Sequence, residues 1–131
     1  MKIIALDLGD VWTGTALSDS LKILAKPYKT IKTIEVLNFL KELFAKEMIE
    51  TMVIGYPQTM KGTESLQTKK VLEQKELIAK TFPDIKIILW DERLSSKTAR
   101  TIQGKNARTQ KENEHSIAAA VILQTYLQFL S

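Results

Sequence analysis

The chain has 131 residues, of which 44% are hydrophobic and 26% charged, and its formal net charge is +4. This length can bury a core as a single domain over residues 1–131, and no apolar run approaches the roughly 20 residues of a membrane span. The absence of cysteine excludes disulfides and thiolate metal sites. We therefore expect a soluble protein with no membrane partner and with no signal peptide before its first strand.

Strand and helix patterns alternate along the chain. The predicted strands are residues 2–8, 12–18, 27–32, 51–55 and 85–90. The predicted helices are residues 35–47, 63–82, 96–103 and 117–130, and the last is apolar on nearly every side, which is typical of a helix between two layers. Three strands in close succession favour antiparallel pairing, whereas the later strands need helical crossovers and parallel pairing. The sequence therefore predicts an α/β fold with a mixed five-stranded sheet flanked by helices.

Acidic residues stand where two of these strands end. Asp7 follows the apolar run IIAL of the first strand, and Asp91 and Glu92 follow the last strand. A free carboxylate on an apolar strand is costly, and ligands of such sheets bind beyond the carboxyl ends of the parallel strands. We expect these acids at one edge of the sheet, although Asp91 or Glu92 can instead pair with Arg93 or cap the following helix.

Other residues in the first two predicted strands and their turns also need an interpretation. Gly9 and Gly14 let the backbone either turn tightly or come close to a phosphate. Trp12 is either a packing residue or a stacking surface for an unpaired base. We interpret Asp19 as a turn residue that closes the second strand.

A basic stretch follows the last predicted strand. Residues 93–111 include six cations and no acid, with Ser, Thr, Gln and Asn between them. Such side chains donate hydrogen bonds to phosphate oxygens, although short basic runs are also common on solvated surfaces. The candidate nucleic-acid contacts are Arg93, Lys97, Arg100, Lys105, Arg108 and Lys111.

Four blocks of the sequence carry a family resemblance: LDLGDVWTGTALSD, VIGYPQTMKGTE, LWDERLSS and IAAAVILQTYL. Together they resemble the bacterial YqgF family, also called Holliday-junction-resolvase-like proteins or pre-16S rRNA nucleases. The blocks stand in the family's order and cover nearly the whole chain. The resemblance implies a ribonuclease H-like fold, a cytoplasmic location, and a nuclease that trims precursor 16S rRNA, with the cleavage of branched DNA junctions as the older proposal.

The resemblance also implies the catalytic residues, which are Asp7, Asp91, Glu92 and His115, with a divalent Mg²⁺ or Mn²⁺ held by Asp7, Glu92 and His115. Two-metal hydrolysis of a phosphodiester needs hard oxygen ligands, which the carboxylates of this set supply. His115 stands where the family has an aspartate, so it can be a ligand, a proton shuttle or a helix cap. The chain is therefore either a metal-dependent nuclease or a catalytically weakened nucleic-acid-binding module of ribosome maturation.

Overall fold

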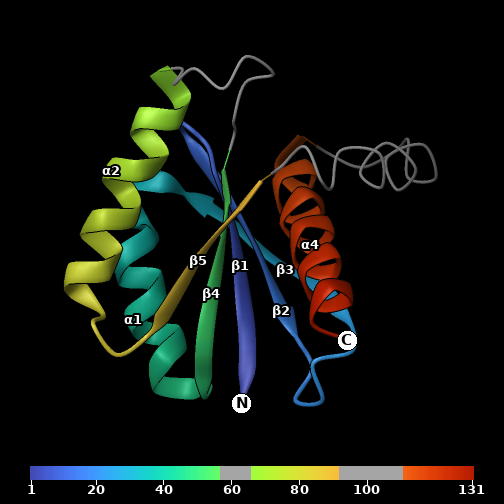
Figure 1. Ribbon diagram of the computed structural model, residues 1–131. Coiled ribbons are helices and arrows are strands. Elements are labelled where there is room, and N and C mark those ends of the chain that lie inside the picture. The colour runs from blue at the N-terminus through green and yellow to red at the C-terminus, as the bar shows by residue number, and fades with distance from the viewer. Residues whose placement is uncertain (57–65, 92–110) are drawn as a thin grey trace.

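The computed structural model describes residues 1–56, 66–91 and 111–131 of the chain. Its strands are β1 (Lys2–Leu8), β2 (Trp12–Ser18), β3 (Ala25–Lys32), β4 (Ile49–Tyr56) and β5 (Lys86–Asp91). They form one sheet in the order β3-β2-β1-β4-β5 (Figure 1). The pairs β1–β2 and β2–β3 are antiparallel, and the pairs β1–β4 and β4–β5 are parallel. The mixed five-stranded sheet predicted from the sequence is confirmed.

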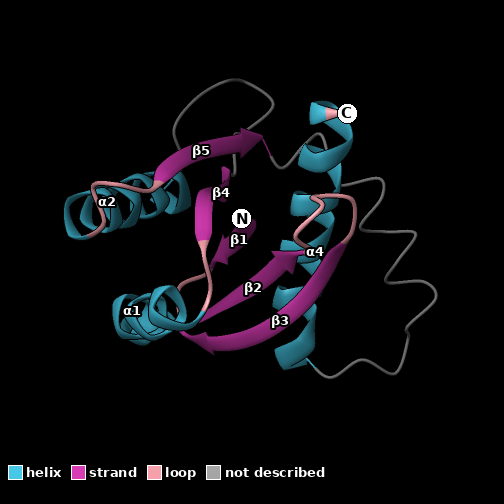
Figure 2. Ribbon diagram, turned by 90° about the horizontal axis from the view of Figure 1, so that it is seen from below, coloured by secondary structure: helices cyan, strands magenta, loops and turns pink. Residues whose placement is uncertain are grey.

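Helices cover both faces of this sheet. A short 3₁₀ turn, η1 (Thr33–Glu35), leads into α1 (Val36–Lys46), and the other described helices are α2 (Leu66–Thr81) and α4 (Lys111–Leu130). Figure 2 shows α1 and α2 against one face, which we call the α1/α2 face, and α4 against the other, the α4 face. Within the described ranges, no helix is both long and apolar enough to span a bilayer.

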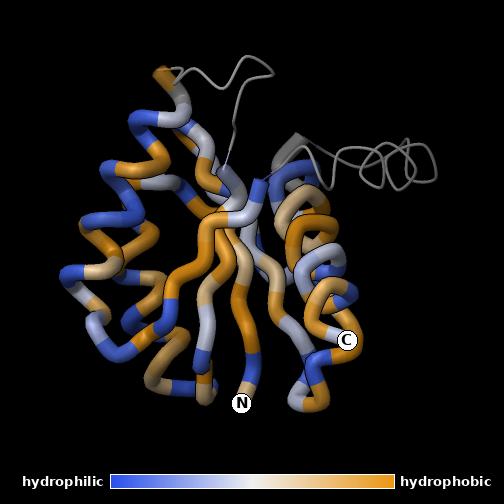
Figure 3. The backbone as a smooth tube through the Cα atoms, in the orientation of Figure 1, coloured by the Kyte–Doolittle hydropathy of each residue, from blue (hydrophilic) through white to orange (hydrophobic). Residues whose placement is uncertain are grey.

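The two faces are packed by alternate residues of each strand. In β1, Ile4 and Leu6 are fully buried in the cluster that includes α1 and α2, whereas Ile3 and Ala5 are buried in the cluster that includes α4. Fully burying one such aliphatic side chain contributes about 1.5–3 kcal/mol. The middle of β1 and β5 is accordingly hydrophobic (Figure 3). Because successive side chains of a strand point to opposite faces, the position of each residue decides which helix it meets.

The last helix differs from its sequence prediction in two ways. It begins at Lys111 rather than at residue 117, because the apolar signal starts at Ile117 while the preceding lysine and glutamates are themselves good helix formers. It also covers one face of the sheet rather than lying between two layers, and Phe129 near its end is 71% exposed. The helix predicted at residues 96–103 lies outside the described residues.

The loop between β2 and β3 is organised by Asp19. Its Oδ1 accepts hydrogen bonds from the backbone N–H of Ile23 at 2.7 Å and of Leu24 at 3.1 Å. These donors, led by that of Leu24, hold the pKa of the Asp19 carboxyl below its ordinary value. The prediction that Asp19 is a turn residue is confirmed.

Candidate active site

The site begins with Asp7, the sixth residue of β1. Alternation along the strand places Asp7 on the α4 face, after Ile3 and Ala5. Its side chain is 19% exposed, so the carboxylate is largely shielded from water. A carboxylate that is shielded in this way needs a charged or hydrogen-bonding partner.

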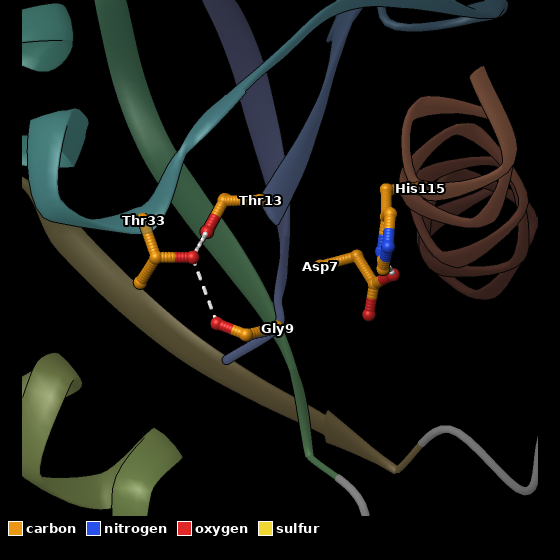
Figure 4. Close-up of polar contacts among 5 residues, drawn as sticks. All are labelled: Asp7, Gly9, Thr13, Thr33 and His115. Carbon is orange, nitrogen blue, oxygen red and sulfur yellow. Dashed lines mark hydrogen bonds and ion pairs between the residues drawn. The ribbon is translucent and has the colours of Figure 1, made fainter. Parts of the chain in front are cut away.

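His115 of α4 supplies that partner. Its Nδ1 lies 3.4 Å from Oδ2 of Asp7, and the two side chains face each other across the gap between β1 and α4 (Figure 4). They are 108 positions apart in sequence, so only the packing of α4 on the sheet brings them together. His115 is the fifth residue of α4, and the interpretation of His115 as a helix cap is therefore wrong.

The contact with Asp7 changes the proton affinity of His115. The hydrogen bond to Asp7 raises the pKa of the His115 imidazole above its ordinary value, and the negative charges of Asp7 and Glu114 act in the same direction. Partial burial of the ring opposes this rise but does not cancel it. In the absence of a metal ion, the pair is thus suited to share a proton.

Two glycines make room for His115. A Cβ on Gly14 of β2 would overlap the backbone carbonyl of His115, so α4 comes close to the sheet because Gly14 has no side chain. A Cβ on Gly9 would overlap the carbonyl of Trp12 and would lie 3.4 Å from Cε1 of His115. Both glycines are needed for close backbone approach, and Gly14 lies within a strand rather than in the tight turn that was one of its two interpretations.

Hydrogen bonds of two threonines stabilise the β1–β2 turn beside the site. The hydroxyl of Thr33 donates to the carbonyl of Gly9 at 2.7 Å and lies 2.8 Å from the hydroxyl of Thr13, which therefore donates to it (Figure 4). Thr13 is fully buried, and Gly9 directly follows β1. These bonds fix the segment that carries Asp7. The sequence did not indicate them, because they depend on the register of β3 against β2.

Asp91 does not share the face of Asp7. It ends β5 opposite Tyr56 of β4, and alternation from Ile87 and Leu89 puts it on the α1/α2 face. The strand β4 also separates β5 from β1, so Asp91 and Asp7 stand two strands apart, or about 10 Å. The sequence correctly placed both acids at one edge of the sheet, but the structure puts them on opposite faces of it.

The remaining predicted residues lie largely outside the described ranges. Glu92 and the basic residues Arg93 to Arg108 are among them, and Lys111 is described only as the first residue of α4. In the part of the chain that the structure describes, no three carboxylate or imidazole groups gather as a metal site. Within residues 1–56, 66–91 and 111–131, Asp7 and His115 form a pair of potential metal ligands without a third.

This donor pair fits a divalent ion. Two ligands that bind one ion at about 2.1 Å lie about 3.0–3.4 Å apart for octahedral to tetrahedral angles, and the Asp7–His115 gap is 3.4 Å. A carboxylate oxygen suits Mg²⁺ and Mn²⁺, and an imidazole nitrogen suits transition ions better than Mg²⁺. The residues present are thus compatible with a metal ion that receives further ligands from elsewhere.

A separate hollow lies on the other side of the β1–β2 turn. Its volume is about 260 Å³, and it is lined by Asp10, Lys70 and Glu73 among others. Lys70 Nζ and Asp10 Oδ1 lie 3.0 Å apart across it. Because α2 provides one of its walls, the hollow belongs to the α1/α2 face and is distinct from the Asp7–His115 pair.

The architecture identifies the fold of the protein. The chain superposes on Thermus thermophilus RuvC, determined in complex with a Holliday junction substrate, with a TM-score of 0.63 and 13% identity. The match covers 98% of this chain and 96% of that one, and the shared architecture is the ribonuclease H-like resolvase fold.

Sequence relatives then identify the family. The proteins named "Putative pre-16S rRNA nuclease" from Rubrobacter xylanophilus and Christiangramia forsetii are 34% identical over 128 residues and 36% identical over 131 residues. These matches cover 97% and 96% of this chain and 92% and 97% of the relatives. Residues 1–129 match the family described as "RuvX: Holliday junction resolvase", and the chain belongs to this RuvX (YqgF) family. The family resemblance seen in the four sequence blocks is confirmed.

Proposed function

We propose that this protein is a metal-dependent nuclease that hydrolyses phosphodiester bonds near the 5′ end of precursor 16S rRNA. The observation that carries the proposal is the Asp7–His115 pair, held at 3.4 Å on the α4 face where β1 ends. The relatives that are 34–36% identical bear the name of a pre-16S rRNA nuclease, which favours RNA as the substrate. Such a role places the protein in the cytoplasm, where ribosomes mature.

The metal ligands in this proposal are Asp7, His115 and Glu92. Asp7 contributes a charged oxygen, and His115 contributes Nδ1, which already faces that oxygen. Glu92 is preferred to Asp91 because Asp91 lies on the opposite face of the sheet. A divalent ion bound here would activate water and neutralise charge on the leaving oxygen.

His115 is suited to an alternative task in the same site, because a nitrogen that ligates a metal ion cannot also carry a proton. Without a metal ion on Nδ1, the hydrogen bond to Asp7 raises the pKa of the imidazole and favours its protonated form, and Nδ1 can pass that proton to the Asp7 carboxylate. Ligation and proton transfer make different demands on the side chain at position 115. Substitution by aspartate retains a ligand, whereas substitution by alanine removes both functions.

The basic residues after β5 would hold the nucleic acid. Arg93, Lys97, Arg100, Lys105, Arg108 and Lys111 carry six positive charges with no acid between them. Each phosphate contact should add about 0.9 to the slope of log affinity against log salt on a duplex. Replacing Lys97, Arg100, Lys105 and Arg108 together by alanine should weaken binding to all sequences alike and flatten this slope.

The second candidate function is the resolution of branched DNA. The description of the matched family as a Holliday junction resolvase favours it. A third possibility, a catalytically weakened binding module, follows from the single histidine in place of a carboxylate. The three differ in what they cleave: RNA with a 5′ precursor end, a four-way junction, or neither.

One experiment separates these functions. The purified protein is incubated with a 5′-labelled precursor 16S rRNA fragment and with a synthetic four-way junction, each with Mg²⁺ and with Mn²⁺. The proposal predicts site-specific cleavage of the RNA and none of the junction. Cleavage of the junction alone would support the resolvase, and binding of both without cleavage would support the weakened module.

A further inference from the structure

Trp12 stands beside the candidate site. In the hairpin of β1 and β2, Asp7 is paired with Gly14, and Trp12 lies two residues before Gly14 on the same face. The backbone N–H of Gly9 donates to the carbonyl of Trp12 at 3.0 Å and fixes the start of β2. Diagonal neighbours of this kind in an antiparallel pair lie about 7–8 Å apart. The indole is therefore presented next to Asp7 on the α4 face.

Trp12 does not pack in the hydrophobic core of the described residues. Trp12 is half-buried and belongs to neither hydrophobic cluster of the described residues. Trp90 provides the contrast, because it packs within the α4-side cluster with ring centroids 5.4 Å from both Tyr126 and Phe129. An aromatic ring that is not packed in the core is available to stack on a base. The two tryptophans thus differ in how they are packed.

A cation accompanies Trp12. Lys32 of β3 is its direct partner in the register of β2 and β3, and Lys32 is exposed. The neighbouring pair Gly14–Thr30 lies under α4, so alternation puts Trp12 and Lys32 on the α4 face as well. Among the residues that the structure describes, no carboxylate forms an ion pair with Lys32. An aromatic ring beside a free cation is the combination that holds a base and its phosphate.

We infer that Trp12 stacks on an unpaired base of the nucleic-acid strand whose phosphodiester lies at Asp7, and that Lys32 contacts a phosphate of the same strand. This inference rests on the proposed nuclease function, and it specifies that the part of the substrate bound at the site is single-stranded. A separation of about 7–8 Å spans about two stacked nucleotides at a rise of about 3.4 Å each. A base inside a duplex has both faces covered by its neighbours, so an unpaired base can stack on the indole where an internal base pair cannot.

The inference can be tested by binding alone, in EDTA, where no metal-dependent cleavage occurs. The Trp90→Phe protein retains Trp12 as its only tryptophan. Its fluorescence should be quenched by a single-stranded RNA 12-mer and should not change with the blunt duplex of the same sequence. In otherwise unchanged protein, Trp12→Leu should weaken single-strand binding roughly 5- to 150-fold and leave duplex binding unchanged, and Trp12→Phe should retain most of the affinity.

Lys32 has a matched control in its own strand. Lys26 is also an exposed lysine of β3, but it pairs with Leu17 and so lies on the α1/α2 face. Lys32→Ala should lower the single-strand salt slope by about 0.7, and Lys26→Ala should leave it unchanged. Circular dichroism and thermal unfolding identify any variant that fails to fold.

The outcomes separate the two proposals. Absence of quenching, or equal losses on single strand and duplex for Trp12→Leu, would overturn the stacking role of Trp12. Neither result depends on cleavage, so failure of the stacking inference leaves the nuclease proposal standing. Conversely, quenching and selective loss of single-strand binding in a protein that cleaves nothing would retain the stacking role and reject the nuclease.

Discussion

The backbone carbonyl of His115 occupies the space where a Cβ on Gly14 would lie. This contact brings the first turns of α4 onto β2 and puts the imidazole beside the Asp7 carboxylate, which is paired with Gly14 in the sheet. The site thus depends on one missing methyl group. The contact brings His115 of α4 to Gly14 and Asp7 of one hairpin, which lie about a hundred positions earlier in the sequence.

Gly14→Ala should therefore separate His115 from Asp7. Because the added methyl group meets backbone rather than a flexible side chain, α4 must shift, and overpacking of this kind typically costs about 1–3 kcal/mol. Urea unfolding should show this loss, and RNA cleavage should fall even where the protein remains folded. Gln128→Ala, at an exposed position of α4, should change neither. Full activity in a stable Gly14→Ala protein would contradict the importance of this contact.

Asp7→Asn should lower the pKa of His115 in the metal-free protein. The hydrogen bond and charge of Asp7 are the main causes of the raised value, and asparagine removes the charge while keeping the shape. His115 is the chain's single histidine, so its ring proton resonance can be followed by NMR titration without assignment. An unchanged midpoint in Asp7→Asn would show that the two side chains do not interact in solution.

The contact between Asp7 and His115 also predicts that the stability of the metal-free protein, measured in EDTA, depends on pH. The pKa of His115 is higher in the folded protein than its value of about 6.5 in the unfolded chain. The resulting stabilisation is fully present below the unfolded pKa and is lost as pH rises through the folded pKa. The free energy of unfolding should therefore be higher for the wild-type protein than for His115→Ala, and this difference should be larger at about pH 5.5 than at about pH 8.5. A difference that is constant with pH would mean that His115 contributes only packing.

Much of the fold could be predicted from sequence because local signals agreed with tertiary structure. The apolar run before Asp7 and the hydrophobic period of residues 35–47 predicted β1 and α1 correctly. The start of α4 was missed, because its first residues are polar and the apolar signal begins at Ile117. Sequence patterns thus identify best those parts of a helix or strand that pack against the hydrophobic core.

The site was less predictable, because its geometry depends on register and on the packing of α4. Asp7 and His115 were identified through family motifs, yet the sequence did not show that they meet. Asp91 could not be separated from Glu92 until the alternation of β5 placed Asp91 on the α1/α2 face. The role proposed for Lys32 depends on its register opposite Trp12, and the sequence predicted the antiparallel pairing of β2 with β3 but not this register.

His115 should also determine the metal preference. An imidazole nitrogen suits Mn²⁺ better than Mg²⁺, so cleavage should be faster with Mn²⁺ in the wild-type protein. His115→Asp restores a carboxylate and should raise the Mg²⁺-supported rate, whereas His115→Ala should lower the Mn²⁺-supported rate. If both variants cleave like wild type with both metals, His115 has no catalytic role.

Cleavage of a 5′ precursor 16S rRNA fragment by the wild-type protein and by Asp7→Asn, in Mn²⁺ and under single-turnover conditions, tests the central claim most directly. Loss of outer-shell partners of a metal typically costs about 10–100-fold, so loss of a direct ligand should reduce the rate by at least about 100-fold. Circular dichroism should be unchanged, and binding of the RNA in EDTA should be largely retained. Equal cleavage rates for the two proteins, each purified to the same standard, would contradict the assignment of Asp7 as the active-site acid.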